Sequence, residues 1–216
     1  MICQFLLVFL TLLFYDPALV PPGTVKIGDY YVEASEVTNG NYLDFLFFQK
    51  ISLDSIAYQR LLPDTSNFWY TMEKYQQKPI VFIGYEQANA YCLWRSITMS
   101  EKHDQLITYR LPTIEEWQDI AKKLIKDNRR QIMRELRNTI KVVRKYPDTY
   151  YLQSIDDDDK GITNYFDNVS EMTDQKGIAM GASNYYLTDL RNNLIRTVNY
   201  TKPNSYIGFR CIATID

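Results

Sequence analysis

The sequence contains very little histidine. One residue of 216, His103, carries an imidazole, and it lies in the polar run "SEKHDQL". Metal sites built from two or three histidines are therefore excluded within this chain. A hydrolase triad would need His103 itself as the general base. Because its neighbours are polar, we expect His103 to be an ordinary solvated residue in a surface loop.

A strong excess of either charge is also missing. The chain has 24 Lys and Arg against 26 Asp and Glu, which gives a net charge of −2. Proteins that act mainly on nucleic acids usually carry a basic excess, so the composition does not support a nucleic-acid partner. With 46% hydrophobic and 14% aromatic residues the chain can bury a core, and its length suits one domain.

Long apolar runs are absent apart from one near the N-terminus. Residues 5–14 are almost wholly apolar; about ten residues are too few for a transmembrane helix but suit a secretory signal. No Lys or Arg precedes the run and no clean cleavage pattern follows it, so an apolar strand or anchor is the alternative. We predict a signal segment in residues 1–19, a single domain in 20–216 and no transmembrane span in the mature chain. The predicted location is the periplasm, the cell envelope or the medium.

Cysteine is scarce as well. The chain has three, of which Cys92 and Cys211 remain if the segment that contains Cys3 is removed. An even number suits an oxidising compartment. A bridge between Cys92 and Cys211 would close a loop of more than a hundred residues and contribute roughly 4–5 kcal/mol. From the residues alone, two buried unpaired thiols are the alternative.

Local patterns predict short strands and helices. Residues 23–37 are rich in Val, Ile and Tyr and predict one or two strands with a turn at Gly28. Thr38 is a typical N-cap residue in front of a run with helical spacing. Residues 78–84 predict a short apolar strand before a helix, and residues 205–215 predict a C-terminal strand.

The clearest helix start is at Thr113. Thr113 and Glu116 have the spacing of a capping box, in which two side chains satisfy free amides of the first turn. Further on, residues 122–145 hold ten basic and two acidic residues. One interpretation is a cationic face for an anionic partner or a membrane surface. The other, which we favour, is a solvated amphipathic helix with these residues inward: Leu124, Ile125, Ile132, Met133, Leu136 and Ile140.

Six segments resemble, in the same order, the motifs of one protein family. They are "VPPGTVKIGDYYVEASEVTNGNYLDFL", "KPIVFIGYEQANAYCLW", "YRLPTIEEWQDIA", "GITNYFDNVSEMT", "GIAMGASN" and "IGFRC". The family is that of the formylglycine-generating enzymes, also called sulfatase-modifying factors. The resemblance implies an α+β fold with little regular secondary structure, a variant of the C-type lectin fold. It also implies a disulfide between Cys92 and Cys211, because the cysteines of these two motifs pair in secreted members.

The segment "FDNVSEMT" resembles a family segment that contributes to a calcium site. The resemblance implies Asn168 and Glu171 as side-chain ligands, with the carbonyl of Val169 as a further one. Calcium prefers six to eight hard oxygen ligands, and these groups supply such oxygens. Both tryptophans of the family segment are replaced here. The alternative is a polar turn held by hydrogen bonds between side chains and backbone.

The resemblance also bears on catalysis. Active family members oxidise a substrate cysteine to formylglycine with oxygen and a copper ion, which two nearby cysteines hold. The corresponding span of this chain, residues 181–211, contains no cysteine before Cys211, which occupies the structural position. Related iron-dependent sulfoxide synthases use three histidines, and one histidine cannot build that site. We therefore predict that copper is not bound and that both chemistries are lost.

Two functions of different classes remain. The first, which we favour, is an exported non-catalytic domain that binds a protein, peptide or glycan in the cell envelope or serves in an envelope assembly. The second is a formylglycine-generating-type oxidoreductase, or another enzyme, with an altered active site. Arg191, Arg196 and Tyr200 occupy the place of the family's active cleft, and arginine can hold an anionic ligand bidentately. Ordinary surface charge is the alternative for these residues.

Overall fold

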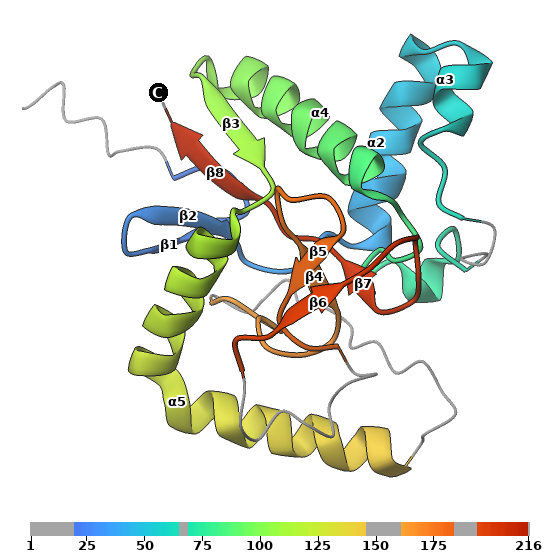
Figure 1. Cartoon of the computed structure of the whole chain (residues 1–216). Helices are drawn as coiled ribbons and strands as arrows, with labels where there is room; N and C mark the ends of the chain where they lie inside the picture. Colours follow the sequence, from blue (N-terminus) through green and yellow to red (C-terminus); the bar gives the residue numbers. More distant parts are fainter. Residues whose placement is uncertain (1–19, 65–68, 146–160, 184–193, 216) are drawn as a thin grey trace, which may run out of the picture.

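The computed structural model describes residues 20–64, 69–145, 161–183 and 194–215. These residues form α-helices and two small β-sheets joined by long irregular segments (Figure 1), which confirms the predicted α+β class. The predicted signal segment, residues 1–19, lies outside them. Among the described helices, none is both long enough and apolar enough to span a bilayer. The elements are β1 (Thr24–Ile27), β2 (Tyr30–Glu33), α2 (Asn39–Ser52), α3 (Ser55–Gln59), the 3-10 helix η2 (Glu73–Tyr75), α4 (Tyr85–His103), β3 (Ile107–Arg110), α5 (Ile114–Lys145), β4 (Ser170–Met172), β5 (Ile178–Met180), β6 (Thr197–Asn199), β7 (Ile207–Gly208) and β8 (Ile212–Ile215).

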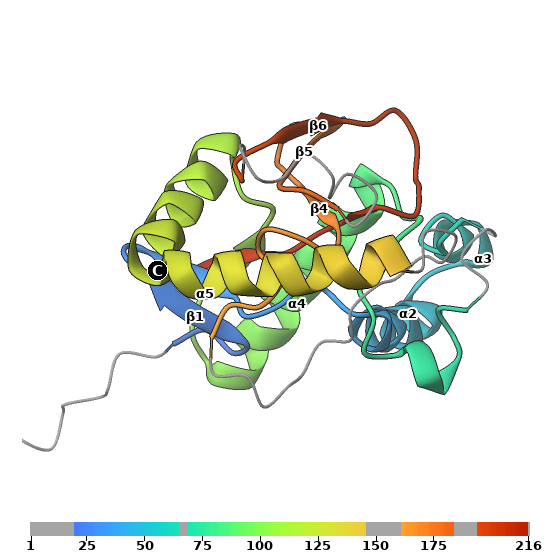
Figure 2. The ribbon, with the colours of Figure 1, turned by 90° about the horizontal axis from the view of Figure 1, so that it is seen from below.

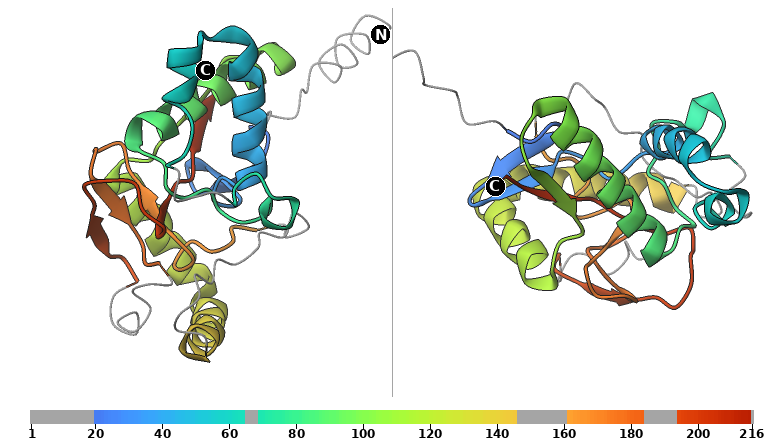
Figure 3. Two further views of the ribbon diagram at one scale, coloured as in Figure 1. Left: turned by 90° about the vertical axis from the view of Figure 1, so that its right-hand side faces the viewer. Right: turned by 90° about the horizontal axis from the view of Figure 1, so that it is seen from above.

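The first sheet brings the two ends of the domain together. Its strands lie in the order β1–β2–β8–β3, and each neighbouring pair is antiparallel. β1 and β2 form a hairpin with the predicted turn at Gly28, whose φ of 63° is left-handed and costs glycine little. Helix α4 lies along β3 (Figures 1 and 3). The C-terminal strand β8 is thereby held in the middle of the sheet.

The second sheet has the order β6–β5–β4–β7, and its strands have two or three residues each. Residues 209–211 lead from β7 into β8, so the strand predicted over 205–215 is divided between the two sheets. Gly208 lies where this crossing is tightest. A Cβ there would approach Cγ2 of Val169 to 2.8 Å and the carbonyl oxygen of Ile80 to 3.0 Å. A larger residue at this position would force the segments apart.

Two hydrophobic clusters fill the space between the helices and the sheets. The first lies among α2, α4 and the strands and has an aromatic centre in which contacting ring centroids are 5.2 to 6.0 Å apart. Its rings are those of Tyr42, Phe45, Tyr91, Trp94 and Phe209. The second cluster lies against α5 and contains Trp117, Ile120, Ile132, Leu136, Tyr165 and Phe166. Burying such large side chains is the main source of stability.

Helix α2 begins where the sequence predicts. The hydroxyl of Thr38 accepts a hydrogen bond from the N–H of Asn41 at 3.1 Å. The side-chain carbonyl of Asn41 accepts one from the N–H of Thr38 at 3.3 Å. The two residues therefore satisfy each other's amides at the helix start.

Helix α5 also starts as predicted and then bends. The N–H of Glu116 donates to the Thr113 hydroxyl at 3.1 Å, and the N–H of Thr113 donates to the Glu116 carboxylate at 2.8 Å. A kink follows at Asn128, where φ is −129° and ψ is 21°. Beyond it, residues 129–145 run along the face of the molecule shown in Figure 2. The inward placement of the apolar residues is confirmed, because these belong to or pack against the second cluster: Leu124, Ile125, Ile132, Met133, Leu136 and Ile140.

Residues 78–84 do not form the predicted strand. The N–H of Ile80 donates to the carbonyl of Val37 at 2.8 Å, whereas the N–H of Phe82 donates to the carbonyl of Asn204 at 2.9 Å. Pro79 has no N–H to donate. Because the backbone groups bond to different segments, no continuous ladder with one neighbouring strand develops.

His103 lies in the last turn of α4 and not in the predicted surface loop. The helix continues to His103, and Asp104, whose φ of 51° is left-handed, caps its end. In this position the side chain of His103 is half-buried. The polar composition of the run thus indicated exposure correctly for Glu101, Lys102 and Asp104, and overestimated it for His103.

Candidate functional site

A buried arginine, Arg210, lies between β7 and β8 at the centre of the molecule. Its side chain is 1% exposed. Nε donates to the carboxylate of Glu171 at 2.8 Å, while the terminal nitrogens donate to the carbonyls of Glu33 at 2.9 Å and Thr163 at 2.7 Å. The guanidinium also lies 5.2 Å from the ring centroid of Tyr165. The protein therefore replaces the water that this charge loses on burial.

The carboxylate of Glu171, on β4, has a second donor. Its other oxygen accepts a hydrogen bond from the indole N–H of Trp117 at 2.9 Å. Burial raises the pKa of Glu171, whereas Arg210 and the indole lower it. Trp117 in turn stacks on Tyr165 with the ring centroids 4.7 Å apart. Together these contacts join α5, β4, the segment before β4 and the segment before β8 in one buried network.

A second carboxyl, Glu36, lies beside the same guanidinium. Its Oε2 is 3.9 Å from a terminal nitrogen of Arg210, and its Oε1 accepts from the side-chain amide of Asn168 at 3.1 Å. Glu36 is fully buried, and within the described ranges Oε2 has no hydrogen-bond partner. Burial raises the pKa of Glu36 to about 8, with Arg210 opposing this shift and Glu171 adding to it. The geometry agrees with this direction, because Glu171 has the close ion pair with Arg210 and Glu36 the distant one.

A third carboxylate links the N-terminal hairpin to α4 and β8. Oε1 of Glu33 lies 2.7 Å from Nε of Arg95, and Oε2 accepts from the N–H of Cys211 at 2.9 Å. Arg95 also donates to the carbonyl of Pro22 at 3.1 Å and lies 4.8 Å from the ring centroid of Tyr109. These contacts and those of Arg210 form what we call the buried charge cluster.

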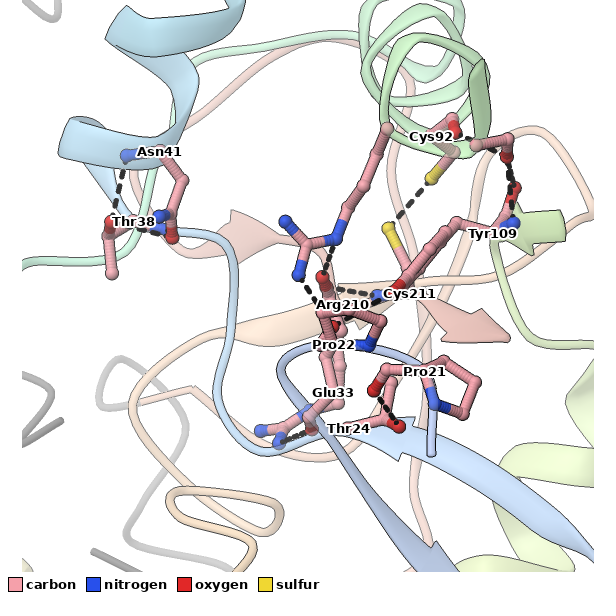
Figure 4. A network of polar contacts seen from close by, with 12 residues as sticks. Pro21, Pro22, Thr24, Glu33, Thr38, Asn41, Cys92, Tyr109, Arg210 and Cys211 are labelled. Atoms are coloured by element: carbon pink, nitrogen blue, oxygen red, sulfur yellow. Dashed lines mark hydrogen bonds and ion pairs between the residues drawn. The ribbon is translucent and has the colours of Figure 1, made fainter. Parts of the chain in front are cut away.

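The two core cysteines lie next to this cluster. Cys92 of α4 and Cys211 point toward each other (Figure 4), with their sulfur atoms 2.9 Å apart. Both side chains are buried, at 2% and 0% exposed. Burial raises the pKa of Cys211 well above its ordinary value. The two residues that the family resemblance pairs are thus neighbours in the core, and their disulfide stays a prediction.

The residues expected to bind calcium are part of the same interior. Glu171 has an N–H donor at each carboxylate oxygen, and the amide of Asn168 faces Glu36. Val169 is buried and packs on Gly208. In the part of the chain that the structure describes, no group of three or more His, Cys, Asp or Glu is placed to hold a metal ion. In this arrangement the side chains do not fit calcium, because a cation would have to displace the donors and approach Arg210.

The calcium site that the family resemblance implies stays a prediction, and a titration tests it. Calcium at a hundredfold excess over its dissociation constant would stabilise the fold by about 2.7 kcal/mol. Thermal denaturation in calcium and in chelator measures this directly. Equal midpoints in the two conditions would contradict the implied site.

Of the three residues expected at a ligand cleft, the structure describes two, and these lie in different surroundings. Arg191 lies outside the described residues. Arg196 precedes β6 and is half-buried, and its carbonyl accepts from the N–H of Gly181 at 2.9 Å. Tyr200 follows β6, and its ring belongs to the first hydrophobic cluster. Burial raises the pKa of Tyr200 to about 12. Tyr200 is therefore a core residue in this structure, and ligand binding by the two arginines stays a prediction.

Sequence reasoning missed the buried charge cluster. A usable signal exists at two positions. Glu36 precedes an apolar residue and a helix cap, and Arg210 stands between Phe209 and Cys211 in an otherwise apolar stretch. A charged residue that a strand carries into the core requires a partner of opposite sign. This rule predicts a pair, although it does not say which acid meets which base.

One comparison with known proteins assigns the chain to a family. A family model described as the sulfatase-modifying factor enzyme 1-like domain matches residues 11–215. No curated protein matches the chain significantly. Among solved structures, PvdO from Pseudomonas aeruginosa is similar with 12% identity, 85% of this chain and 80% of that chain covered, and a TM-score of 0.43. CarF is similar with 15% identity, 87% of each chain covered and a TM-score of 0.49. These two likenesses are weak, so the assignment rests on the family model.

Proposed function

Because the chain belongs to the sulfatase-modifying factor enzyme 1-like family, we propose that it is an exported, non-catalytic member of it. Its role is to bind a protein, peptide or glycan of the cell envelope, alone or within an envelope assembly. The single observation that carries the non-catalytic part is the position of its cysteines.

Cys92 and Cys211 are both buried, and they face each other rather than a surface. A copper ion needs thiolate ligands that are open to oxygen and to the substrate. The burial of Cys211 keeps its sulfur away from oxygen and from a substrate. The remaining cysteine of the sequence, Cys3, lies in the predicted signal segment. This supports a domain that retains the family fold without the family's copper chemistry.

The polar residues of the family-like motifs support the same proposal. Glu36, Glu171 and Arg210 come from three of these motifs, and each is buried and engaged with the others. Groups used in this way hold segments together and are not available to a substrate. A binding surface would then be formed by the exposed segments that this interior supports.

Mass spectrometry tests the non-catalytic assignment. The full chain is incubated with copper, oxygen and a peptide that carries a sulfatase motif, with an active formylglycine-generating enzyme as the positive control. We expect no conversion of the peptide cysteine to formylglycine. Conversion by this chain would support the altered oxidoreductase instead.

Export is tested separately by the N-terminus of the processed protein. When the chain is expressed in a bacterium, cell fractionation should place it in the envelope or the periplasm. Intact-mass analysis should show loss of a segment close to residues 1–19. An uncleaved chain in the cytosol would contradict export without affecting the result on catalysis.

A further inference from the structure

The distal half of α5, residues 129–145, carries a regular row of cations. Five basic residues follow one another at spacings of four, three, four and three positions: Arg130, Arg134, Arg137, Lys141 and Arg144. These spacings place the side chains on one side of an α-helix. With a rise of about 1.5 Å per residue, the row is about 21 Å long. We call these five residues the basic stripe.

The basic stripe is exposed, and the described part of the chain places no acidic partner on it. All five side chains are exposed, on a helix that runs along the face shown in Figure 2. Across the described ranges, none of the five takes part in an ion pair. The one acidic residue of this half, Glu135, accepts a hydrogen bond from Gln131 instead. Like charges at these spacings destabilise a helix, so the fold does not explain the stripe.

The opposite side of the distal half holds the stripe in place. Ile132 and Leu136 are buried in the second hydrophobic cluster. The hydroxyl of Thr139 donates to the carboxylate of Asp167 at 2.9 Å, and both residues are buried. Because these contacts already bury the apolar side, the helix cannot insert that side into the hydrocarbon interior of a bilayer. A partner therefore meets the charges alone.

Charge is strongly segregated between this half and the rest of the molecule. Residues 129–145 contain seven basic residues and one acidic residue, which gives +6. Since the whole chain carries −2, all other residues together carry −8. The stripe is therefore a local concentration of positive charge in a chain that is acidic as a whole. The partner must be anionic and extended over about 21 Å.

We propose that the basic stripe docks the domain on the surface of a bilayer that contains anionic phospholipids. A flat anionic surface can meet all five cations along a straight helix at once. Four of the five are arginines, whose guanidinium groups bind phosphate oxygens bidentately. Residues 129–145 contain no aromatic side chain on which bases could stack, and the chain has no basic excess, so a nucleic acid fits less well. This inference does not depend on whether the domain is catalytic.

Vesicle co-sedimentation tests the proposal. The full chain is mixed with phosphatidylcholine vesicles, with and without phosphatidylglycerol. The variant R134Q/R137Q/K141Q should bind anionic vesicles about a hundredfold more weakly than the wild type, because each basic residue near the surface contributes about fivefold. Wild-type binding should also disappear at high salt.

A matched control removes the same charge elsewhere. The variant K50Q/R60Q/K102Q changes three exposed basic residues on or next to α2, α3 and α4. It should bind anionic vesicles like the wild type. Circular dichroism and the thermal midpoint show that both triple variants are folded. The apolar run at residues 5–14 is present in the wild type and in every variant, so its contribution to vesicle binding is the same in all of them.

Three outcomes would overturn the proposal. The first is wild-type binding that is no stronger on anionic than on neutral vesicles. The second is an equal loss of binding in the stripe and control variants, which would indicate net charge alone. The third is stripe-dependent binding to a duplex oligonucleotide or to polyglutamate without binding to anionic vesicles, which would assign the stripe to another class of partner.

Discussion

Arg210 and the arginines of the basic stripe carry the same charge in opposite surroundings. Arg210 is 1% exposed and is held by Glu171 and by backbone carbonyls. The stripe residues are exposed and have no ion pairs among the described residues. A buried charge requires partners that replace water, whereas an exposed one requires none. The contacts within the fold therefore account for Arg210. They do not account for the stripe, for which we propose an anionic bilayer as the partner.

The largest effect is expected beside Arg210, at the two core cysteines. In exported protein, Cys92→Ser should lower the free energy of unfolding by about 4–5 kcal/mol, because the disulfide with Cys211 would close a long loop. Chemical denaturation of the wild type and the variant measures this, with the reduced wild type as the control. An unchanged midpoint together with an unchanged free-thiol count would show that no bridge forms.

Replacing the buried arginine should have nearly as large an effect. Arg210→Met leaves Glu171 buried without its cation and two carbonyls without a donor, which should cost about 3–5 kcal/mol. The control is Arg110→Ala, since Arg110 pairs with Glu116 while 40% exposed and should cost about 1 kcal/mol or less. Urea denaturation compares the two. Similar losses for both would break the distinction between buried and exposed charge.

The buried cluster should also respond to pH through Glu36. Its pKa is raised on folding from 4.5 to about 8, so the folded state binds a proton more tightly than the unfolded state. The stabilisation is complete below pH 4.5 and falls as the pH rises to 8, by at most about 1.4 kcal/mol per pH unit.

The isosteric change Glu36→Gln should flatten this dependence. The variant should match the wild type near pH 4.5 and be the more stable protein above pH 8. Denaturation curves recorded across this range provide the measurement. Parallel pH profiles for the two proteins would mean that Glu36 is ionised in the folded state.

The smallest effect on stability is expected at the stripe. R134Q/R137Q/K141Q removes like-charge neighbours on α5, so the fold should be unchanged or more stable by about 1 kcal/mol. Thermal denaturation at low salt shows this most clearly, because salt screens the repulsion. A clear loss of stability would mean that the stripe supports the fold, and the contrast with Arg210 would disappear.

Features that depend on near neighbours were predictable from the sequence. The caps at Thr38 and at Thr113 with Glu116 involve residues three positions apart, and both are confirmed. The turn at Gly28 is confirmed for the same reason. Residues 78–84 were mispredicted because their hydrogen bonds go to Val37 and Asn204, which local pattern does not reveal.

The candidate site was predicted only in part. The family resemblance placed Cys92 and Cys211 together, and they are neighbours in the core. Tyr200 was expected at a ligand cleft and lies in the first hydrophobic cluster. The burial of Tyr200 depends on contacts with segments far along the chain. The local spacing of residues around Tyr200 does not reveal these contacts.

The sequence by itself determined the helix starts, the hairpin turn, the lack of a multi-histidine site and the spacing of the basic stripe. Each of these depends on composition or on residues within about one or two helical turns. Only the tertiary structure decided that Arg210 meets Glu171 and Glu36, and that burial raises the pKa of Glu36. These partners are separated by 39 residues or more, and a carboxyl's pKa depends on burial and on charges that folding alone brings near it.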